Sequence, residues 1–389
     1  MPQFGGEAMK PVRFIHTSDL HLDTSFSASG FPSRLGDRKR DSIRGAFRRI
    51  LGLARSGNAD LVLIAGDLFE LERITPDTVE FIRRQLEGLG EIPVFISPGN
   101  HDPCVQGSPY REEKWPNNVH IFCSEKFESV ELPHLGVRVT GFGFAHAHLD
   151  THHFQQLPVL PGGLANIVVS HGSDISRVPT GKSRHGPFTV DEIAGKNVLY
   201  CALGHYHEQH RLPNPIDDTQ IWYSGIPEGR GWDEEGSRGC LLGEIDEGGV
   251  RVESQVCSQY NLKTITINCD TFSTREQIAE TILEQRGVLF DSSTILRIQL
   301  VGSVDPRLDL SFPELEARLS GEALYIRWDD QTRSALDFES MANERTLRGR
   351  FIRIMNERLA NAREEDRIPL ERARLYGVQA LSGQEVRLR

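Results

Sequence analysis

The sequence has no apolar run that reaches the roughly 18–20 residues needed to cross a bilayer as a helix. Its amino-terminal residues also lack the apolar stretch and the small-residue cleavage site of a secretory signal. The chain contains no internal repeat and no low-complexity tract. We therefore expect a cytoplasmic protein that does not associate with a membrane.

Closely spaced cysteines are absent too. No two of the six cysteines form a CxxC pair, which argues against a zinc ribbon and against a thioredoxin-like motif. Their wide spacing predicts reduced, mostly structural thiols rather than disulfides. The six are Cys104, Cys123, Cys201, Cys240, Cys257 and Cys269.

An excess of basic residues is also missing, since the formal net charge is −11. This acidity is unusual for an enzyme that acts on nucleic acid, but net charge says little about a local patch. Seven basic residues stand against two acidic ones between Arg34 and Arg49, and eleven arginines against six acidic residues between Arg345 and Arg389. These two segments are either solvated helix faces or contacts for a polyanion.

Within the first 210 residues, short apolar runs alternate with helical patterns, which is typical of an α/β domain. The run ADLVLIAGD is apolar without interruption, as expected of a strand buried on both faces. Residues 37–56 have apolar side chains at helical spacing. Thr75 followed by Pro76 predicts an N-cap and the first turn of another helix, which we expect to run to about Leu89.

The rest of the chain divides into three stretches. Residues 211–256 have the glycine-rich punctuation of hairpins. From about Tyr260 the pattern is β-α-β-α-β, and from about Phe338 it is arginine-rich and helical, with an apolar face. The apolar face comprises Leu347, Phe351, Ile354, Met355 and Leu359. We therefore expect a first domain over residues 1–257, a small α+β domain over 258–335 and a helical tail over 336–389.

Five of the predicted strands end in short polar turns that are rich in metal-ligating side chains. In open α/β sheets the functional groups gather beyond the carboxyl ends of the strands, so we expect these turns to meet at one site. Residues two apart in an extended segment project to the same side, which lets the two members of a DxH or HxH pair address one centre. The turns carry Asp19 and His21; Asp67; Asn100, His101 and Asp102; His171; and His205 and His207.

The types of side chain in these turns indicate the metal. Histidine nitrogens with carboxylate and amide oxygens, and without a thiolate, suit divalent ions such as Mn²⁺, Fe²⁺ or Zn²⁺. Seven ligands are too many for one tetrahedral ion, but they suit two ions about 3.5–4 Å apart that share a carboxylate and a hydroxide. Each motif alone is also an ordinary turn, whereas the ordered set favours a metal centre. The seven are Asp19, His21, Asp67, Asn100, His171, His205 and His207.

The motifs SDLHLD, AGDLFE, SPGNHD, VVSHG and LGHYH resemble, in this order, those of the calcineurin-like metallophosphoesterases. The resemblance implies two facing mixed β-sheets flanked by helices. It implies two metal ions, for which Mn²⁺ is the expected metal. One ion would bind Asp19, His21, Asp67 and His207, and the other Asp67, Asn100, His171 and His205. It makes His101 the catalytic histidine that assists the leaving oxygen, after a hydroxide that bridges the metals has attacked phosphorus.

Three further segments resemble the nuclease branch of this family, the SbcD-like and YhaO-type DNA-repair exonucleases. They are RKRDSIRGAFRRIL, GDLFE and YSGIPEGRGWDEEGSRGCLL, and the resemblance covers residues 11–330. It implies a DNA exonuclease or endonuclease that acts on single- or double-stranded ends, with a small DNA-contacting cap after Tyr260. Homodimers are possible. The apolar face that begins at Leu347 either docks on a coiled-coil ATPase of the SbcC or YhaN kind or packs within the chain.

Two other functions remain open. The same scaffold could serve a phosphatase or a cyclic-nucleotide phosphodiesterase with a small substrate, although neither needs the additional β-α-β unit and basic helix. The chain could also be a non-enzymatic adaptor of an ATPase complex, although every ligand position is filled.

Several residues have two interpretations. Asp102 either orients His101 or closes a turn, and Arg230 either binds substrate phosphate or is an ordinary surface arginine. Glu70 departs from the histidine or aspartate that some relatives carry after GDLF. Other histidines are not assigned to the site: His146, His148, His152 and His153 are expected in a surface loop, His16 in the core, and His185 and His210 in loops.

Overall fold

The computed structural model describes residues 10–26, 30–176, 183–305, 308, 310–383 and 386. The chain divides into two compact units, Met1–Leu262 and Lys263–Arg389. The boundaries of the three predicted domains stay predictions. Among the described residues, no helix is both long and apolar enough to cross a membrane.

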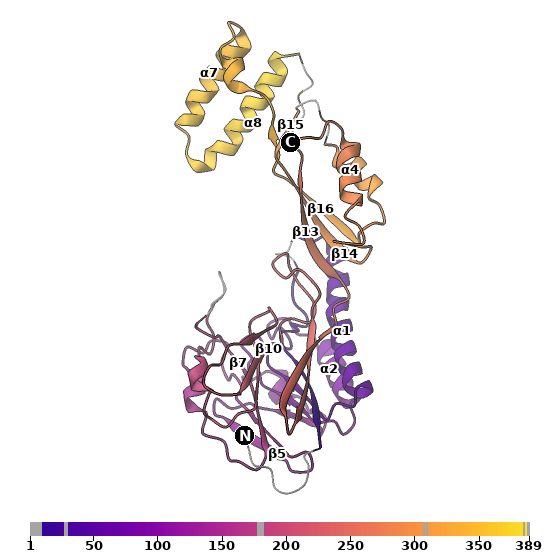
Figure 1. Ribbon diagram of the computed structural model, residues 1–389, viewed down its shortest axis with the longest axis vertical. Helices are drawn as coiled ribbons and strands as arrows, with labels where there is room; N and C mark the ends of the chain where they lie inside the picture. Colours follow the sequence, from indigo (N-terminus) through magenta and orange to yellow (C-terminus); the bar gives the residue numbers. More distant parts are fainter. Residues whose placement is uncertain are drawn as a thin grey trace. The chain divides into compact units, whose positions relative to one another are not determined.

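The first unit contains two six-stranded mixed sheets (Figure 1). In the first sheet the order is β12 (Gly249–Val256), β11 (Gly239–Asp246), β1 (Val12–Thr17), β2 (Leu61–Ile64), β3 (Val94–Ile96) and β4 (Val119–Ile121). Strands β1 to β4 are parallel, and β11 runs antiparallel to both β1 and β12.

In the second sheet the order is β5 (Glu128–Leu132), β6 (Val137–Gly141), β7 (Ala165–His171), β8 (Tyr200–Gly204), β10 (Gln220–Tyr223) and β9 (His210–Leu212). Here β6, β7, β8 and β10 are parallel, and the two edge strands are antiparallel to their neighbours.

Alternating side chains of the strands form two cores. Phe14 of β1 and Leu63 of β2 belong to a cluster with Ile167 of β7, so these faces of the two sheets meet. Ile15 and Ile64 point the other way and pack with α1 (Ser33–Ser56) and α2 (Pro76–Glu87), which lie on the outer face of the first sheet (Figure 1). This confirms the two facing sheets flanked by helices. It also explains the uninterrupted apolar run of β2, because every residue of that strand is buried.

The local signals for the helices are largely confirmed. Thr75 caps α2, its side chain accepting a hydrogen bond from the Thr78 amide, and Pro76 is the first helical residue. The helix ends at Glu87, shortly before the predicted end. Helix α1 begins at Ser33, four residues before the predicted start at Asp37.

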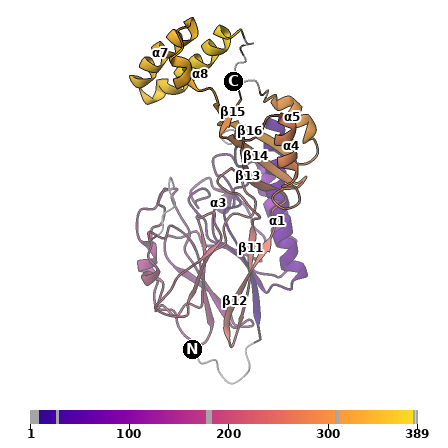
Figure 2. The ribbon, with the colours of Figure 1, turned by 45° about the horizontal axis from the view of Figure 1, so that its top comes forward.

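The second unit has its own core. Strands β13 (Asn261–Asn268), β14 (Thr294–Val301) and β16 (Tyr325–Asp330) form a sheet, and α4 (Arg275–Leu283) and α5 (Phe312–Arg318) cover one face of it (Figure 2). A small two-stranded sheet, β15 (Ser303–Val304) with β17 (Arg333–Ser334), follows. The helices α6 (Phe338–Ala342), α7 (Leu347–Ala360) and α8 (Glu364–Leu381) complete the unit, as the helical pattern from Phe338 predicts.

The prediction of uniformly reduced cysteines is wrong for one pair. Cys104 and Cys123 form a disulfide with their Cα atoms 5.3 Å apart. Their separation of 19 residues contained no sign of this proximity. Cys104 lies in the loop after β3, and Cys123 follows β4, the neighbour of β3 in the sheet, so strand pairing brings them together. The other four cysteines are free and buried.

Candidate metal centre

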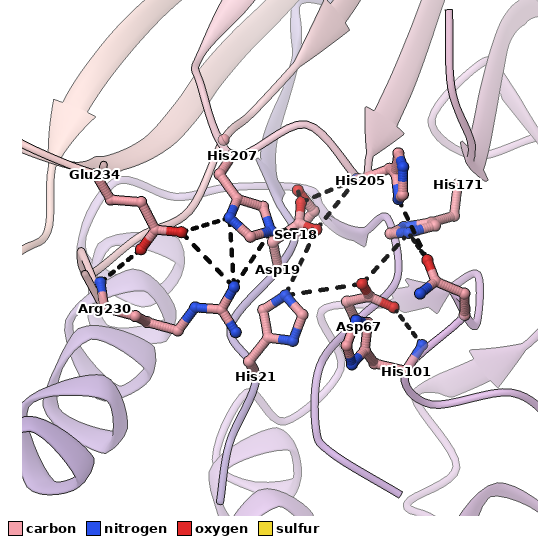
Figure 3. Close-up of polar contacts among 12 residues, drawn as sticks. Ser18, Asp19, His21, Asp67, His101, His171, His205, His207, Arg230 and Glu234 are labelled. Atoms are coloured by element: carbon pink, nitrogen blue, oxygen red, sulfur yellow. Dashed lines mark hydrogen bonds and ion pairs between the residues drawn. The ribbon is translucent and has the colours of Figure 1, made fainter. Parts of the chain in front are cut away.

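The seven predicted ligands meet where five strands end; Figure 3 labels all of them except Asn100, which contacts His171 and His205. β1, β2 and β3 of the first sheet lead into the turns with Asp19, Asp67 and Asn100, whereas β7 and β8 of the second sheet lead to His171 and His205. The predicted convergence is therefore a convergence of two sheets. The five strands are not consecutive, because β4, β5 and β6 lie between β3 and β7.

Hydrogen bonds join the loops of the two sheets. The Asp19 amide donates to the Gly66 carbonyl at 3.0 Å, and the His21 amide donates to the Asp67 carbonyl at 2.9 Å. Across the sheets, the His205 amide donates to the Asp19 carboxylate, 3.1 Å from each oxygen. The loops are thereby fixed to one another without any bound ion.

Four of the predicted ligands have a positive backbone φ angle, which residues other than glycine rarely adopt. The angles are 54° for Asp19, 47° for His21, 52° for Asp67 and 108° for His205. Such conformations cost of the order of 1–3 kcal/mol each and persist only where the surroundings enforce them. Their concentration here indicates that the loops are shaped for the side chains they direct into the site.

Asp19, His21 and His207 form one group of possible ligands. Oδ1 of Asp19 lies 3.9 Å from Nε2 of His21 and 4.0 Å from Nε2 of His207. One ligand atom of each residue lies within 4.8 Å of the others, a spacing at which a single ion could contact all three.

Asp67 lies between this group and the second one. Its Oδ2 atom is 3.7 Å from Nε2 of His21 and 3.4 Å from Nε2 of His171. Its Oδ1 atom accepts a hydrogen bond from the His101 amide at 2.9 Å, which fixes the plane of the carboxylate. One oxygen of Asp67 thus faces a histidine from each of the two predicted ion sites.

Asn100, His171 and His205 form the second group. Oδ1 of Asn100 lies 3.1 Å from Nε2 of His171 and 3.2 Å from Nδ1 of His205. The other nitrogen of each ring faces a backbone carbonyl, that of Ala65 for His171 and that of Ser183 for His205. Each ring therefore directs one nitrogen at Asn100 and the other at the protein, as metal-binding histidines typically do.

Two ligands of the first group contact carboxylates outside the ligand set. Nδ1 of His21 lies 2.8 Å from Glu70, and Nδ1 of His207 lies 2.5 Å from Glu234. Both contacts leave Nε2 for an ion. Sequence reasoning missed Glu234, although it lies in the segment YSGIPEGRGWDEEGSRGCLL that carried the nuclease resemblance.

The donor set fits a divalent ion. Nε2 of His21 is buried and has no hydrogen-bond partner among the described residues, and leaving a buried polar atom unpaired is costly. It faces the carboxylates of Asp19 and Asp67. A cation at this place would satisfy all three groups.

The protonation of the buried groups follows from burial and from their neighbours. Burial, followed by the charge of Arg230, lowers the pKa of His21 to about 4, and burial lowers that of His205 to about 3. Burial also opposes protonation of His171, but Asp67 and Asp19 raise its pKa to about 9. Because metal binding requires neutral histidines, His21 and His205 are ready for an ion and His171 must release a proton.

His101 and Asp102 have different surroundings. His101 is 43% exposed, and its Nδ1 lies 2.8 Å from Glu70. Asp102 is fully buried and accepts hydrogen bonds from the amides of Asp67, Leu68 and Gly99 and from the Tyr110 hydroxyl. These contacts favour the interpretation in which Asp102 closes a turn, because its carboxylate joins the loops of Asp67 and Gly99. The carboxylate that contacts the His101 ring is that of Glu70.

Arg230 lies beside the first ligand group and is mostly buried. Its side chain is 19% exposed, and Nη2 lies 3.3 Å from Nδ1 and 3.4 Å from Nε2 of His207. The guanidinium lies 3.6 Å from both Glu234 and Glu70 (Figure 3). A cation in this position can contact an anionic substrate beside the first ligand group.

The histidines left out of the site have other surroundings. As predicted, His16 is buried, 2.9 Å from the Tyr200 hydroxyl and 3.1 Å from the Leu203 carbonyl. His146 and His148 are exposed. The prediction is wrong for two residues: His153 is completely buried, and His210 begins β9. His185 lies in a loop, as expected.

Comparison with known proteins supports the same assignment. Residues 12–209 match the family model described as calcineurin-like phosphoesterase. The chain is 29% identical over 250 residues to the uncharacterized metallophosphoesterase YhaO of Bacillus subtilis, covering 63% of this chain and 60% of that protein's length. It is 26% identical over 358 residues to the DNA double-strand break repair protein Mre11 of Saccharolobus solfataricus, covering 84% of each.

Among solved structures, a dimetal phosphatase from Danio rerio aligns at 11% identity with a TM-score of 0.39, covering 64% of this chain and 97% of the other. The family assignment rests on the sequence matches and not on this likeness. The match to the family model spans half of the chain and includes every predicted ligand. The motifs that suggested the family also bring their ligand atoms together in the structure. The chain therefore belongs to the calcineurin-like phosphoesterase family of metal-dependent hydrolases.

Proposed function

We propose that this protein is a two-metal phosphodiesterase that cleaves DNA at or near its ends in repair. The observation that carries the proposal is the position of Asp67, whose Oδ2 atom faces His21 of one ligand group and His171 of the other. A shared carboxylate is the feature that distinguishes a two-metal site from a single-metal one. Asp19, His21, Asp67 and His207 would hold one ion, and Asp67, Asn100, His171 and His205 the other.

When bound, two such ions would lower the pKa of a water molecule and neutralise charge on the phosphoryl oxygens. The protein supplies the rest. His101, beside Asp67 and partly exposed, is the proposed catalytic group that donates a hydrogen bond to the departing oxygen. Glu70 and Asp67 raise the pKa of His101 against the effect of burial, and the raised pKa favours the protonated ring. Arg230 is proposed to bind a substrate phosphate.

The choice of DNA as substrate rests on similarity and on the size of the chain. The match to a DNA double-strand break repair protein covers 84% of this chain, so it extends beyond the first unit. A second unit with its own core would give a polymer more surface to contact than a small substrate needs. A phosphatase or a cyclic-nucleotide phosphodiesterase remains the second candidate, because the ligand set alone serves either.

The partner proposal is a coiled-coil ATPase at the helical tail. The predicted apolar face is divided: Met355 of α7 is buried and Phe351 packs near Gly377 of α8, whereas Leu347 is 71% exposed and Ile354 45% exposed. Packing within the chain therefore accounts for one part of the face. The exposed part is the proposed contact, and pull-downs with and without residues 338–389 test it.

The function is tested by incubating metal-free protein with Mn²⁺ and end-labelled single- and double-stranded DNA, beside p-nitrophenyl esters and cyclic nucleotides. Shortened DNA products in the presence of Mn²⁺ are expected. Turnover of the small esters alone would favour the phosphatase. A protein that binds no transition metal would favour the adaptor.

A further inference from the structure

Glu70 lies between two histidines of the site and contacts both with one carboxylate. Its Oε1 atom is 2.8 Å from Nδ1 of His21, and its Oε2 atom is 2.8 Å from Nδ1 of His101. A carboxylate can only accept hydrogen bonds, so the nitrogen that faces it carries the hydrogen in both rings. Nε2 of each ring then faces away from Glu70, and that of His21 is the buried atom without a partner described above.

The backbone holds Glu70 in this place. Its amide donates to the Leu22 carbonyl at 3.0 Å, next to His21, and the Leu71 amide donates to the His101 carbonyl at 3.0 Å. The segment around Glu70 is therefore hydrogen-bonded to both loops whose histidines it contacts. The side chain is 17% exposed, which limits competition from water.

We propose that Glu70 is a positioning residue that sets the orientation and tautomer of His21 and His101 together. It would thereby link a ligand of the first ion to the group that assists the leaving oxygen. This inference rests on the proposed phosphodiesterase function. A neutral histidine at this position would have one acceptor nitrogen and could serve only one of the two rings, whereas a carboxylate can serve both.

A different explanation of the contacts is a structural ion pair, since Nη1 of Arg230 lies 3.6 Å from Oε1 of Glu70. The two explanations differ in what Glu70→Gln does. Glutamine keeps the shape of the side chain but offers one acceptor oxygen, and its amide group donates. One of the two rings must then turn or change its tautomer, whereas a purely structural role predicts a change in stability alone.

The experiment compares wild-type protein with Glu70→Gln in two measurements. The first is Mn²⁺ titration of the metal-free protein by calorimetry, in which we expect one site to lose about 10–100-fold in affinity. The second is kcat and KM for two phosphodiesters that differ in their leaving group, nitrophenol and a nucleoside alcohol. We expect the loss in kcat to be larger for the alcohol, which needs more help from His101, with KM within about threefold.

Two more variants make the result decisive. Glu72→Gln changes an exposed glutamate of the same loop and should match wild type in both measurements. Glu70→Asp keeps two acceptor oxygens and should recover part of what Glu70→Gln loses. The thermal unfolding midpoint shows whether Glu70→Gln folds. If it does not fold, the same two measurements on Glu70→Asp test the inference, and we expect smaller losses of the same pattern.

Wild-type Mn²⁺ affinity in Glu70→Gln, together with equal losses for both leaving groups, would overturn the inference. Failure of the proposed function has a different result, because wild-type protein would then bind Mn²⁺ but cleave neither ester. In that event the Mn²⁺ titration of Glu70→Gln still shows whether Glu70 positions His21.

Discussion

Oε1 of Glu234 accepts a hydrogen bond from Nδ1 of His207 at 2.5 Å. The same carboxylate accepts the Arg230 amide at 2.6 Å and lies 3.6 Å from the Arg230 guanidinium. It is buried and held ionised, since its contacts with His207 and Arg230 lower its pKa far below the usual range despite burial. One buried glutamate thus orients a predicted metal ligand and a predicted phosphate-binding arginine.

Replacing this glutamate should weaken the first ion site. Glu234→Ala removes the acceptor for His207 and leaves that ring free to turn. We expect Mn²⁺ affinity or kcat to fall by about 10–100-fold, measured by calorimetry and by turnover. Asp233→Asn, at an exposed neighbour, is the matched control. Unchanged Mn²⁺ affinity together with unchanged kcat in Glu234→Ala would show that His207 needs no such support.

Asp67→Asn should disturb both ions, because one oxygen of Asp67 faces a histidine from each group. We expect the bound Mn²⁺ to fall below two ions per chain and turnover to drop by at least about 100-fold. Elemental analysis after desalting measures the first and a phosphodiester assay the second. A variant that retains two ions per chain would contradict the shared-carboxylate arrangement.

His101→Ala should separate metal binding from catalysis. The ring contacts Glu70 and lies outside the predicted ligand set, so its loss should leave the Mn²⁺ content unchanged while kcat falls by about 10²–10⁴-fold. His134→Ala, at an exposed histidine, should behave as wild type in both assays. Loss of an ion in His101→Ala would instead identify His101 as a ligand, an arrangement that the spacing of His21, Asp67 and His101 also permits.

A buried ion pair between Lys39 and Glu228 should matter for stability. Nζ of Lys39 lies 2.5 Å from Oε1 of Glu228, with both side chains at most 1% exposed. Glu228→Gln leaves the lysine charge unpaired, for which we expect a loss of about 3–5 kcal/mol in the free energy of unfolding. Urea denaturation measures this loss. Adding Lys39→Met should restore most of it, and a double variant no more stable than Glu228→Gln would rule out the unpaired charge as the cause.

Stability of the metal-free protein should fall below about pH 6.5. Burial lowers the pKa of His16 and of His153 to about 3, so each stays neutral in the folded protein but takes up a proton when unfolded. Stability is complete above the unfolded pKa of about 6.5 and declines as the pH falls towards 3, by about 2–3 kcal/mol per histidine down to pH 4.5. Urea unfolding at pH 4.5 and 7.5 of wild type and His153→Phe isolates one contribution. An equal pH dependence in both proteins would refute it.

The sequence predicted the metal ligands better than it predicted the residues that contact them. Asp19, Asp67 and Asn100 follow apolar strands in turns whose side chains indicate a metal site, and β1, β2 and β3 are parallel, so their carboxyl ends had to share an edge. The same strand-end pattern named His171 and His205, but it did not show that they come from a second sheet. Local periodicity also sufficed for α2 and its Thr75 cap.

The supporting residues depended on tertiary structure. Glu70, Glu234 and Asp102 act through contacts with residues 27 to 49 positions away in the chain, or with loops from a neighbouring strand, and no spacing rule predicts which carboxylate reaches which histidine. The Cys104–Cys123 disulfide and the burial of His153 were missed for the same reason, because both result from how strands and loops pack.

The sequence by itself therefore determined the chemistry of this protein: which side chains can hold ions, and on which strand ends they lie. That information is local, since a ligand and the turn that presents it are neighbours in the chain. Only the tertiary structure decided the arrangement: which oxygen of Asp67 faces both ligand groups, which ring nitrogens stay available, and which buried carboxylates contact those rings. Those properties depend on distances between segments remote in sequence, which packing of the two sheets sets.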